Sequence, residues 1–477
     1  VLTELDHPNV LRLLEAYSDA RHVYVITEVC LGGSLNDWLP EVQGDASFAE
    51  RVTREITGAL AHCHSRGVCH RDLKPANILM LRDDRQSPVR VADFGLAKRC
   101  SKQVLTQRME WSAARSEIFN NRPPAAPPGP NPLNRTAPLA NRRHRALVPL
   151  ITDKEKRDKA DKPSRPKDEM PANVKMFSVK GTPEYMAPEV LRVLDSQVNK
   201  TDSFKLLYYD FRCDLWSLGV IVHQIMTGRM PYSVYDVSFH VAEGAALPPL
   251  SREAFAQNLQ ALDFIEECLR AEFQKRASAE EMLKHPWLAS DAVSLRPTPA
   301  TVSHVMGRLR CFAQLSQFKR AALLAAVRHL GSYEHEQLRQ LFAKVDNFST
   351  GAVSAERLQE MCAQAQAAAA NAQAGDGADA GARIIEEVAV VAAFEKRGEI
   401  DYTEFLAAIM DHRLEEREDL VRAVYSFFDA DGDGSVSLAD LECVLDSRSA
   451  QEVLDIGDTD GDGDLSFEEF LELLRRG

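Results

Sequence analysis

Two short segments carry carboxylate, amide and ammonium groups at a spacing that suits phosphoryl transfer. His70, Arg71 and Asp72 open the stretch HRDLKPAN, and Asp93 follows in VADFGLAK. Asp72 could accept or orient the proton of an attacking hydroxyl, and Lys74 could neutralise charge on the transferred phosphoryl group. Asn77 and Asp93 offer the hard oxygen ligands that suit Mg²⁺ on the phosphates of a nucleotide. The spacing therefore predicts a catalytic site for phosphoryl transfer with a magnesium site at Asn77 and Asp93.

Two acidic stretches near the end of the chain have the spacing of an EF-hand calcium loop. In DTDGDGDLSFEE, residues 458–469, oxygen ligands fall at loop positions 1, 3 and 5, glycine at 6 and glutamate at 12. DADGDGSVSLAD, residues 429–440, fits equally well except that Asp440 replaces the final glutamate, which predicts weaker Ca²⁺ binding or more Mg²⁺ occupancy. The expected Ca²⁺ ligands are Asp429, Asp431, Asp433, Ser435, Asp440, Asp458, Asp460, Asp462, Asp464 and Glu469.

Composition limits the class of protein that can position these groups. The chain has 477 residues, of which 45% are apolar and 27% charged, enough for roughly two to four domains. No apolar run is long enough to span a membrane, and the first residues do not resemble a signal peptide. Nine cysteines without a CxxC pair indicate reduced thiols in the cytoplasm or nucleus. The net charge of -14 argues against general binding to nucleic acid.

The pattern along the chain changes several times. Residues 1–98 mix short apolar runs with helical periodicity, and residues 100–176 are rich in proline and charge, which predicts a disordered insertion. Order resumes at FSVKGTPEYMAPEVL and continues to Trp287. From 302 to 330, apolar residues recur at helical spacing among several Lys and Arg residues, which predicts a basic amphipathic helix. Four helix–loop–helix patterns follow, interrupted by an Ala/Gly-rich spacer.

Residues 1 to about 288 resemble a eukaryotic protein kinase that lacks its beginning. The resemblance rests on HRDLKPAN, DFG, GTPEYMAPE and CDLWSLGV in this order. It implies that Thr182 bonds near Asp72 and Lys74, that Glu189 pairs with Arg276, and that Asp214 holds the catalytic loop by its backbone. It also implies ATP contacts at the hinge residues Glu28 and Cys30, and Lys74 favours Ser/Thr over Tyr chemistry.

Several positions leave alternatives open. Ser178 lies where many kinases carry an activating phosphate, which could pair with Arg71, although an ordinary solvated serine fits the sequence as well. Ser34, Ala76 and Gln224 replace carboxylates that help related kinases bind substrate arginines, which predicts a weaker preference for basic substrates. His62, Cys63, His64, Cys69 and His70 crowd like metal ligands, but the kinase register makes them structural rather than a zinc site.

Two further hands have lost ligands. In DNFSTGAVSAER, Phe348 and Arg357 occupy loop positions 3 and 12, and in AFEKRGEIDYTE, Ala393 and Arg397 occupy positions 1 and 5. None of these side chains can coordinate Ca²⁺, so we expect this pair to serve in packing, with Val353 and Ile400 pairing the loops. Kinase, basic helix and four EF-hands in this order resemble the calcium-dependent protein kinases of plants and protists. In that family the helix blocks the substrate region at low calcium, and the calcium-loaded hands capture it.

The sequence thus predicts an α+β protein-kinase-like domain, mostly its helical lobe, followed by an all-α EF-hand domain. The expected boundaries are a kinase domain at 1–288 with an insertion at about 100–176, a junction or autoinhibitory helix at 299–330, a degenerate hand pair at 331–410 and a calcium-binding pair at 415–477. We expect a calcium-regulated Ser/Thr kinase that uses ATP, Mg²⁺ and Ca²⁺, with protein substrates and an intramolecular contact between junction helix and EF-hands. The expected form is a cytoplasmic monomer without nucleic-acid or transmembrane segments; a nuclear or membrane-attached location stays open.

The alternative is a calcium-responsive pseudokinase or scaffold. The segment LDHPNVLRLLEAY resembles the stretch after the helix that carries a kinase's ion-pairing glutamate. In that register the Gly-rich loop and the nucleotide-binding lysine precede Val1, so residues 1–477 alone are expected to phosphorylate poorly.

Overall fold

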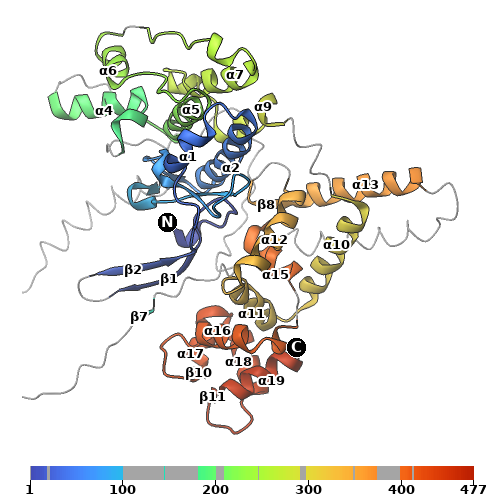
Figure 1. Ribbon diagram of the computed structural model, residues 1–477. Coiled ribbons are helices and arrows are strands. Elements are labelled where there is room, and N and C mark those ends of the chain that lie inside the picture. Colours follow the sequence, from blue (N-terminus) through green and yellow to red (C-terminus); the bar gives the residue numbers. More distant parts are fainter. Residues whose placement is uncertain are drawn as a thin grey trace, which may run out of the picture.

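The computed structural model describes residues 2–18, 22–99, 144–145, 181–199, 209–244, 246–289, 297–346, 350–372, 398–410 and 413–476. Their buried apolar side chains form two clusters, one within residues 10–288 and one within residues 302–474. Figure 1 shows these as an α+β N-terminal unit above a mainly helical C-terminal unit. Ser178 and the loop residues Phe348, Ala393 and Arg397 lie outside the described residues, as does the 100–176 insertion except for His144 and Arg145.

A short antiparallel sheet begins the N-terminal unit. β1 (Leu13–Ser18) pairs with β2 (Val23–Thr27), and the register shifts between Leu13 and Glu15. β7 (His144–Arg145), from the insertion, pairs with the other edge of β1, so the strand order is β2-β1-β7. The chain leaves β2 at Glu28, whose amide donates to the carbonyl of Arg12.

Helix α2 (Ala46–Ser65) lies at the centre of the N-terminal unit because its apolar residues recur at helical spacing. Asp45 caps its first turn by accepting a hydrogen bond from the amide of Phe48. α2 packs against α5 (Arg212–Thr227), a nearly completely buried helix that ends at Gly228, where φ is +69°. The remaining helices are α1 (Leu35–Val42), α4 (Pro188–Asn199), α6 (Val234–Glu243), α7 (Leu259–Cys268), α8 (Ala279–Leu283) and α9 (Pro286–Ala289).

Two small two-stranded sheets place the predicted catalytic segments side by side. β3 (Val68–Cys69) pairs with β6 (Lys98–Arg99), and β4 (Ile78–Met80) pairs with β5 (Val89–Val91) in the register Ile78 to Val91. Because residues 70–77 connect β3 to β4 and residues 92–97 connect β5 to β6, both connections run between the same two sheets. Short 3₁₀ turns occur at Leu2–Glu4, Pro75–Asn77, Phe94–Leu96, Pro183–Tyr185, Glu253–Phe255 and Phe273–Lys275.

The predicted single helix over 302–330 is two helices in the structure, which corrects the sequence prediction. α10 (Pro299–Gln314) ends before Leu315, whose backbone is extended, and α11 (Gln317–Val327) begins after Ser316. The Ser316 hydroxyl accepts a hydrogen bond from the Lys319 amide, an N-cap that makes a new start more favourable than a continuous helix. Both helices pack mainly against helices of the C-terminal unit.

The C-terminal unit contains two pairs of loops that are joined by short strands and flanked by helices. In the first pair the loops meet through β8 (Ala352–Ser354) and β9 (Glu399–Asp401), where Val353 pairs with Ile400 as the sequence predicts. In the second pair they meet through β10 (Val436–Ser437) and β11 (Asp464–Leu465). The helices are α12 (Ser332–Val345), α13 (Ala355–Ala372), α15 (Tyr402–Ile409), α16 (Glu418–Phe428), α17 (Leu438–Val444), α18 (Ser447–Gly457) and α19 (Phe467–Arg476), with a 3₁₀ turn at Leu414–Glu416. Within the described residues, no helix has the length and apolarity needed to cross a membrane.

Candidate active site and calcium loops

Asp214 holds the loop that carries Asp72. The backbone amides of His70 and Arg71 each donate a 2.9 Å hydrogen bond to the Asp214 carboxylate, and the His64 ring lies 2.9 Å from it. Burial acts to raise the pKa of Asp214, but the hydrogen bond from His64 and the charge around it leave this pKa below its ordinary value. The fixed loop includes Arg71 at φ +69°, and Asp93 in the neighbouring connection has φ +58°. Such backbone strain in two non-glycine residues is typical of functional sites.

Asp72 lies at the centre of a compact polar cluster. Its carboxylate accepts hydrogen bonds from the Thr182 hydroxyl at 2.6 Å and from Lys74 Nζ at 2.9 Å. Lys74 Nζ also lies 2.9 Å from the Thr182 hydroxyl, so one ammonium group contacts both partners. Burial acts to raise the pKa of Asp72, but the hydrogen bonds from Thr182 and Lys74 outweigh it and lower the pKa. Asp72 is therefore held ionised, as a proton acceptor must be.

Asn77 and Asp93 border the same site from the two neighbouring connections. The Asn77 side-chain amide donates to the Asp72 carbonyl at 2.8 Å and lies 3.3 Å from its carboxylate, which leaves the amide oxygen of Asn77 for another contact. Asp93 is exposed, and its carboxylate accepts a hydrogen bond from the amide of Gly95 at 3.2 Å. An amide oxygen and an exposed carboxylate are a donor set that fits Mg²⁺.

Glu189 and Arg276 form a buried ion pair. The Arg276 guanidinium contacts both Glu189 oxygens, at 2.6 Å and 3.1 Å, and both side chains are at most 4% exposed. Arg276 also donates to the carbonyls of Arg212 and Arg270 and lies over the ring of Trp216. The pair thus ties the start of α4 to the start of α5 and to the turn before α8.

The predicted hinge residues follow β2. The Glu28 side chain points into the interior rather than towards solvent: its Oε1 accepts from Arg90 Nε at 2.9 Å and from the Arg12 amide at 2.8 Å. Cys30 is half-buried, and burial raises the pKa of its thiol to about 11. Leu31 and Gly32 then connect to β4 by backbone hydrogen bonds to Leu81 and Met80.

Three neutral residues, Ser34, Ala76 and Gln224, were placed by the sequence analysis where related kinases carry carboxylates for substrate arginines. Their surroundings differ. Ser34 bonds to the exposed Asp37 carboxylate at 2.6 Å, and Gln224 accepts a 3.0 Å hydrogen bond from the Tyr185 hydroxyl. Ala76 is exposed. Asp37 and Tyr185 were missed by the sequence analysis; Asp37 could have been found as the third residue of a capping box that starts at Ser34.

The crowded histidines and cysteines have structural partners. His64 stacks on Phe211, and His70 contacts the ring of Phe94 while its Nε2 lies 2.9 Å from the Ala92 carbonyl. Cys69, Cys213 and Asp214 come close enough to share an ion. Burial, however, raises the pKa of Cys69 well above its ordinary value, which disfavours the thiolate that a metal needs.

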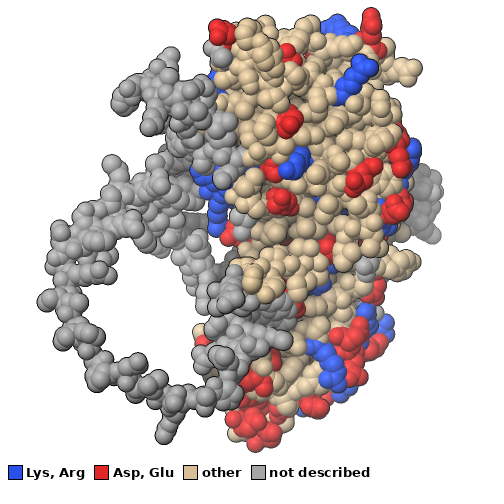
Figure 2. All heavy atoms as spheres, turned by 60° about the vertical axis from the view of Figure 1, so that its left-hand side comes forward, with Lys and Arg blue, Asp and Glu red and all other residues tan. Residues whose placement is uncertain are grey.

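The second hand pair presents its predicted ligands in two loops. Carboxylate oxygens of Asp429, Asp431 and Asp433 gather within 4.8 Å of one another, and those of Asp458, Asp460 and Asp462 do the same. Figure 2 shows Asp and Glu gathered at the lower end of the molecule, the end that carries α17 to α19 in Figure 1. Ser435 and Asp464, at position 7 of each loop, are 3.2 Å apart through their side chains.

The last loop position differs between these hands as the sequence predicts. Glu469 accepts hydrogen bonds from both the amide and hydroxyl of Thr459 and of Ser466, which lower its pKa to about 2. The shorter Asp440 accepts from Ser437 and from the Ala430 amide. Both carboxylates face their own loops, so the donor sets of both loops fit Ca²⁺, the second more fully.

Basic side chains of α10 and α11 donate hydrogen bonds to the carboxyl ends of helices in the C-terminal unit. Arg308 of α10 donates to the carbonyl oxygens of Ile409 and Met410, where α15 ends. Lys319 of α11 donates to the carbonyl of Leu474 in the last turn of α19 at 3.1 Å. Cations favour the carboxyl ends of helices, where unpaired carbonyl groups carry partial negative charge.

Phe318 of α11 lies between the two predicted calcium loops. Its ring is 5.6 Å from that of Phe428, which directly precedes Asp429, and 5.2 Å from that of Phe470, which directly follows Glu469. A movement of either loop would therefore displace an aromatic ring that contacts α11 directly.

The contact between the two units was not predicted from sequence. A cavity of about 280 Å³ lies within it, lined by residues of both units that include Glu28 and Arg90 of the N-terminal unit. Arg12 of β1 donates to the Val327 carbonyl at the end of α11, and Arg82 pairs with Glu336 of α12. Ordinary surface charges of this kind carry no sequence signal, because their partners lie hundreds of residues away.

Comparison with known proteins agrees with this architecture. The family described as "Protein kinase domain" matches residues 1–114 and 167–288, and the family described as "EF-hand domain pair" matches residues 445–477. Calcium-dependent protein kinase 3 of Plasmodium berghei is 25% identical over 100% of this chain and 71% of its own length. Calcium-dependent protein kinase 11 of Oryza sativa is 28% identical over 99% of this chain and 66% of its own length, and calcium-dependent protein kinase 34 of Arabidopsis thaliana is 25% identical over 98% and 73%.

The fold and the two kinds of site define a protein kinase domain joined to an EF-hand domain. Over nearly its whole length the chain is similar to calcium-dependent protein kinases, at 25–28% identity. These findings support a calcium-regulated Ser/Thr protein kinase whose cofactors are ATP, Mg²⁺ and Ca²⁺.

Proposed function

We propose that the kinase domain transfers the γ-phosphate of ATP to Ser/Thr hydroxyls of proteins, with Asp72 orienting the hydroxyl and accepting its proton. The observation that carries this proposal is the 2.6 Å contact between the Asp72 carboxylate and the Thr182 hydroxyl. It supports an ionised Asp72 whose surroundings accommodate a hydroxyl donor, the group that a Ser or Thr substrate would present.

The neighbouring residues take complementary roles in this proposal. Lys74, 2.9 Å from Asp72, neutralises charge on the transferred phosphoryl group. Asn77 and Asp93 hold Mg²⁺, which neutralises charge on the nucleotide phosphates when bound. Asp214 and the Glu189–Arg276 pair position the loop and the segment around Thr182, and Glu28 and Cys30 mark the hinge that faces ATP. Ser178 remains a candidate phosphorylation site that would pair with Arg71.

Regulation is proposed to run through α10 and α11. Ca²⁺ bound by the loops at 429–440 and 458–469 stabilises the packing of α11 on α16 and α19, with Phe318 as the direct contact. In the absence of Ca²⁺ this packing weakens and the basic helices are released towards the substrate region, which inhibits transfer. The protein is proposed to act as a cytoplasmic monomer, since nine cysteines without a CxxC pair suit a reducing compartment.

The test is phosphate transfer from Mg²⁺-ATP to a Ser/Thr protein substrate, with Ca²⁺ or with a chelator. It uses residues 1–477 and the same chain fused at Val1 to the Gly-rich strands of a related kinase. In the fused chain we expect calcium-stimulated transfer that is lost in Asp72→Asn. Ca²⁺ binding without transfer in either form would contradict the proposal and favour the scaffold alternative.

A further inference from the structure

Residues of both loops of the first hand pair contact the kinase domain. In the loop at 393–404, Asp401 at position 9 pairs with Arg66 at the end of α2, with 2.8 Å between Oδ1 and Nη2. Thr403 at position 11 donates its amide and its hydroxyl to the carboxylate of Asp6, at 2.8 Å and 2.6 Å. Asp6 thus receives two hydrogen bonds from one residue of the other domain.

The companion loop at 346–357 contacts the same part of the kinase domain. The backbone of Thr350 hydrogen-bonds the ring of His62, whose Nε2 accepts from the amide of Asp6. Gly351, at position 6 with φ +80°, packs so closely on His7 that an added Cβ atom would collide with this ring. His7 and His62 are both buried in this contact.

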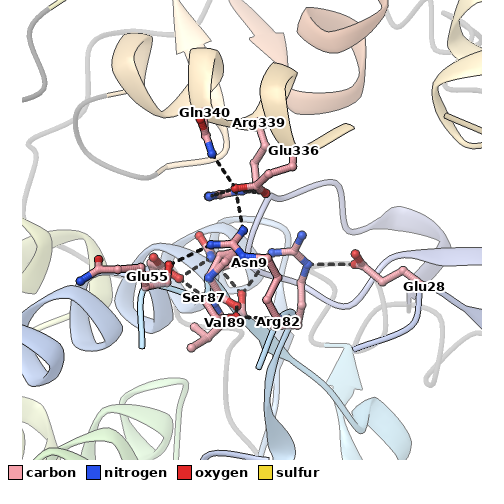
Figure 3. A network of polar contacts seen from close by, with 12 residues as sticks. Asn9, Glu28, Glu55, Arg82, Ser87, Val89, Glu336, Arg339 and Gln340 are labelled. Carbon is pink, nitrogen blue, oxygen red and sulfur yellow. Dashed lines mark hydrogen bonds and ion pairs between the residues drawn. The ribbon is translucent and has the colours of Figure 1, made fainter. Parts of the chain in front are cut away.

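A third contact comes from α12, the first helix of the pair. Figure 3 shows Glu336 between Arg339 of its own helix and Arg82 of the kinase domain. Its carboxylate lies 2.9 Å from Arg82 Nη1 and 2.8 Å from Arg339 Nε. Burial acts to raise the pKa of Glu336, but the bonds from Arg339 and the charge of Arg82 lower it to about 2. The carboxylate is therefore charged across the physiological pH range.

The loop at 346–357 also keeps its shape by contacts within the protein. Asp346, at position 1, accepts hydrogen bonds from the amides of Thr350 and Gly351 at 3.0 Å and 2.8 Å. Arg357, at position 12, donates to the carbonyl of Val345 at 3.2 Å and pairs with Glu360. A guanidinium thus lies at the position where an intact hand supplies its bidentate carboxylate, so Ca²⁺ is not needed to hold this loop.

We propose that the first hand pair is a calcium-independent docking surface for the kinase domain, formed by Glu336, Thr350, Gly351, Asp401 and Thr403. Its partner is the surface made by Asp6, His7, His62, Arg66 and Arg82 of the same chain. Four of these five docking residues lie in the two loops that lack calcium ligands, and Glu336 lies in α12, which precedes the first of these loops. The docked pair is the fixed anchor, and the loops at 429–440 and 458–469 are the part that responds to calcium. This inference goes beyond the proposed function and does not depend on phosphoryl transfer.

Hydrogen exchange of the whole chain tests docking directly. The amide of Thr403 donates to Asp6, so exchange in residues 398–406 reports the contact itself. We expect strong protection of this segment and of residues 58–67 both in Ca²⁺ and in chelator. Protection that appears only with Ca²⁺ would overturn the proposal.

A charge exchange supplies the matched variants. Arg66→Asp should raise exchange in residues 398–406 at least about tenfold, with and without Ca²⁺, and Arg66→Asp combined with Asp401→Arg should restore protection. Glu399→Arg is the control, because Glu399 is an exposed neighbour on the same strand. Thr403→Val, which keeps the side-chain shape, tests the Asp6 contact if the charged variants fold poorly. Equal exchange in Arg66→Asp, Thr403→Val and Glu399→Arg would refute the docking role, and so would loss of protection in Glu469→Gln.

Discussion

The hydroxyl of Thr182 donates a 2.6 Å hydrogen bond to Asp72, although 110 residues separate them in the chain. Lys74 contacts both groups, so the catalytic loop and the segment GTPEYMAPE are joined at a single point. The contact links the geometry of the 181–189 segment to the ionised state of Asp72.

Replacing Asp72 by Asn should reduce phosphate transfer by about 10² to 10⁴-fold, because the amide cannot accept the substrate proton. The measurement is initial-rate incorporation of phosphate into a protein substrate at saturating ATP. Thr182→Val should lower the rate less, and Thr182→Ser should restore it because the hydroxyl is kept. An Asp72→Asn enzyme with unchanged rate would exclude Asp72 from proton transfer.

Replacing Glu469 by Gln should weaken Ca²⁺ binding at 458–469 by about tenfold or more, since the bidentate carboxylate is lost. Asp440→Glu should strengthen binding at 429–440, because the longer side chain reaches the ion. Calorimetric titration with Ca²⁺ would measure both effects. Glu404→Gln in the first hand pair is the control variant and should leave the Ca²⁺ titration unchanged. Loss of a Ca²⁺ site in this variant would show that the first pair also binds the ion.

Replacing Phe318 by Leu should raise the Ca²⁺ concentration for half-maximal kinase activation by about threefold to tenfold. The ring contacts of Phe318 with Phe428 and Phe470 contribute about 1–3 kcal/mol, and their loss weakens the state that Ca²⁺ favours. Activity measured across a Ca²⁺ titration provides the value. Tyr333→Leu, on an exposed position of α12, should not shift the midpoint; an equal shift in both variants would argue against a specific coupling contact.

Replacing Arg276 by Met should lower the free energy of unfolding of the kinase domain by about 3–5 kcal/mol, because Glu189 would be left charged and buried. Urea denaturation followed by tryptophan fluorescence is suitable, since Trp216 lies beside Arg276. As a surface comparison, Arg448→Ala removes an exposed ion pair and should change the value by at most about 1 kcal/mol. A small change in the free energy of unfolding of Arg276→Met would mean that Glu189 is protonated in the variant or pairs with another residue.

Docking of the two domains should weaken as the pH falls below about 6.5. Burial, with His7 and Arg66 close by, lowers the pKa of His62 to about 2. His335 of α12 lines the cavity between the two units, and burial lowers its pKa to about 3. A histidine in water has a pKa of about 6.5. Between that pH and the lowered pKa of each docked histidine, the undocked state binds a proton that the docked state does not. Lowering the pH therefore favours undocking. Burial raises the pKa of Asp6, which acts in the opposite direction because the docked state then binds a proton more readily than the undocked state.

Hydrogen exchange in residues 398–406 at pH 7.5, 6.5 and 5.5, corrected for intrinsic rates, measures this effect. His62→Gln should flatten the pH dependence, and His304→Gln, at an exposed position of α10, should leave it unchanged. A pH profile that is flat in the unmodified protein would contradict the assignment.

Much of the site could be predicted from local spacing. Asp72, Lys74 and Asn77 lie within six residues, and the calcium ligands lie within twelve-residue loops, so the residue types themselves limit what each segment can bind. The helical break at Leu315 and Ser316 could not be predicted in this way. Apolar periodicity continues through these residues, and the break depends on an N-cap and on tertiary packing: both helices contact α15, but α10 also packs on α13 and α11 on α16.

The sequence by itself determined the chemistry: the groups for phosphoryl transfer, the stronger and weaker calcium loops, and the loss of ligands in the first hand pair. Tertiary structure decided which distant groups meet, such as Thr182 with Asp72, Phe318 with both calcium loops, and Asp401 with Arg66. The physical reason is that ligand spacing within a loop is set by local backbone geometry. A contact across hundreds of residues is instead selected from many equally suitable surface charges by the packing of whole domains.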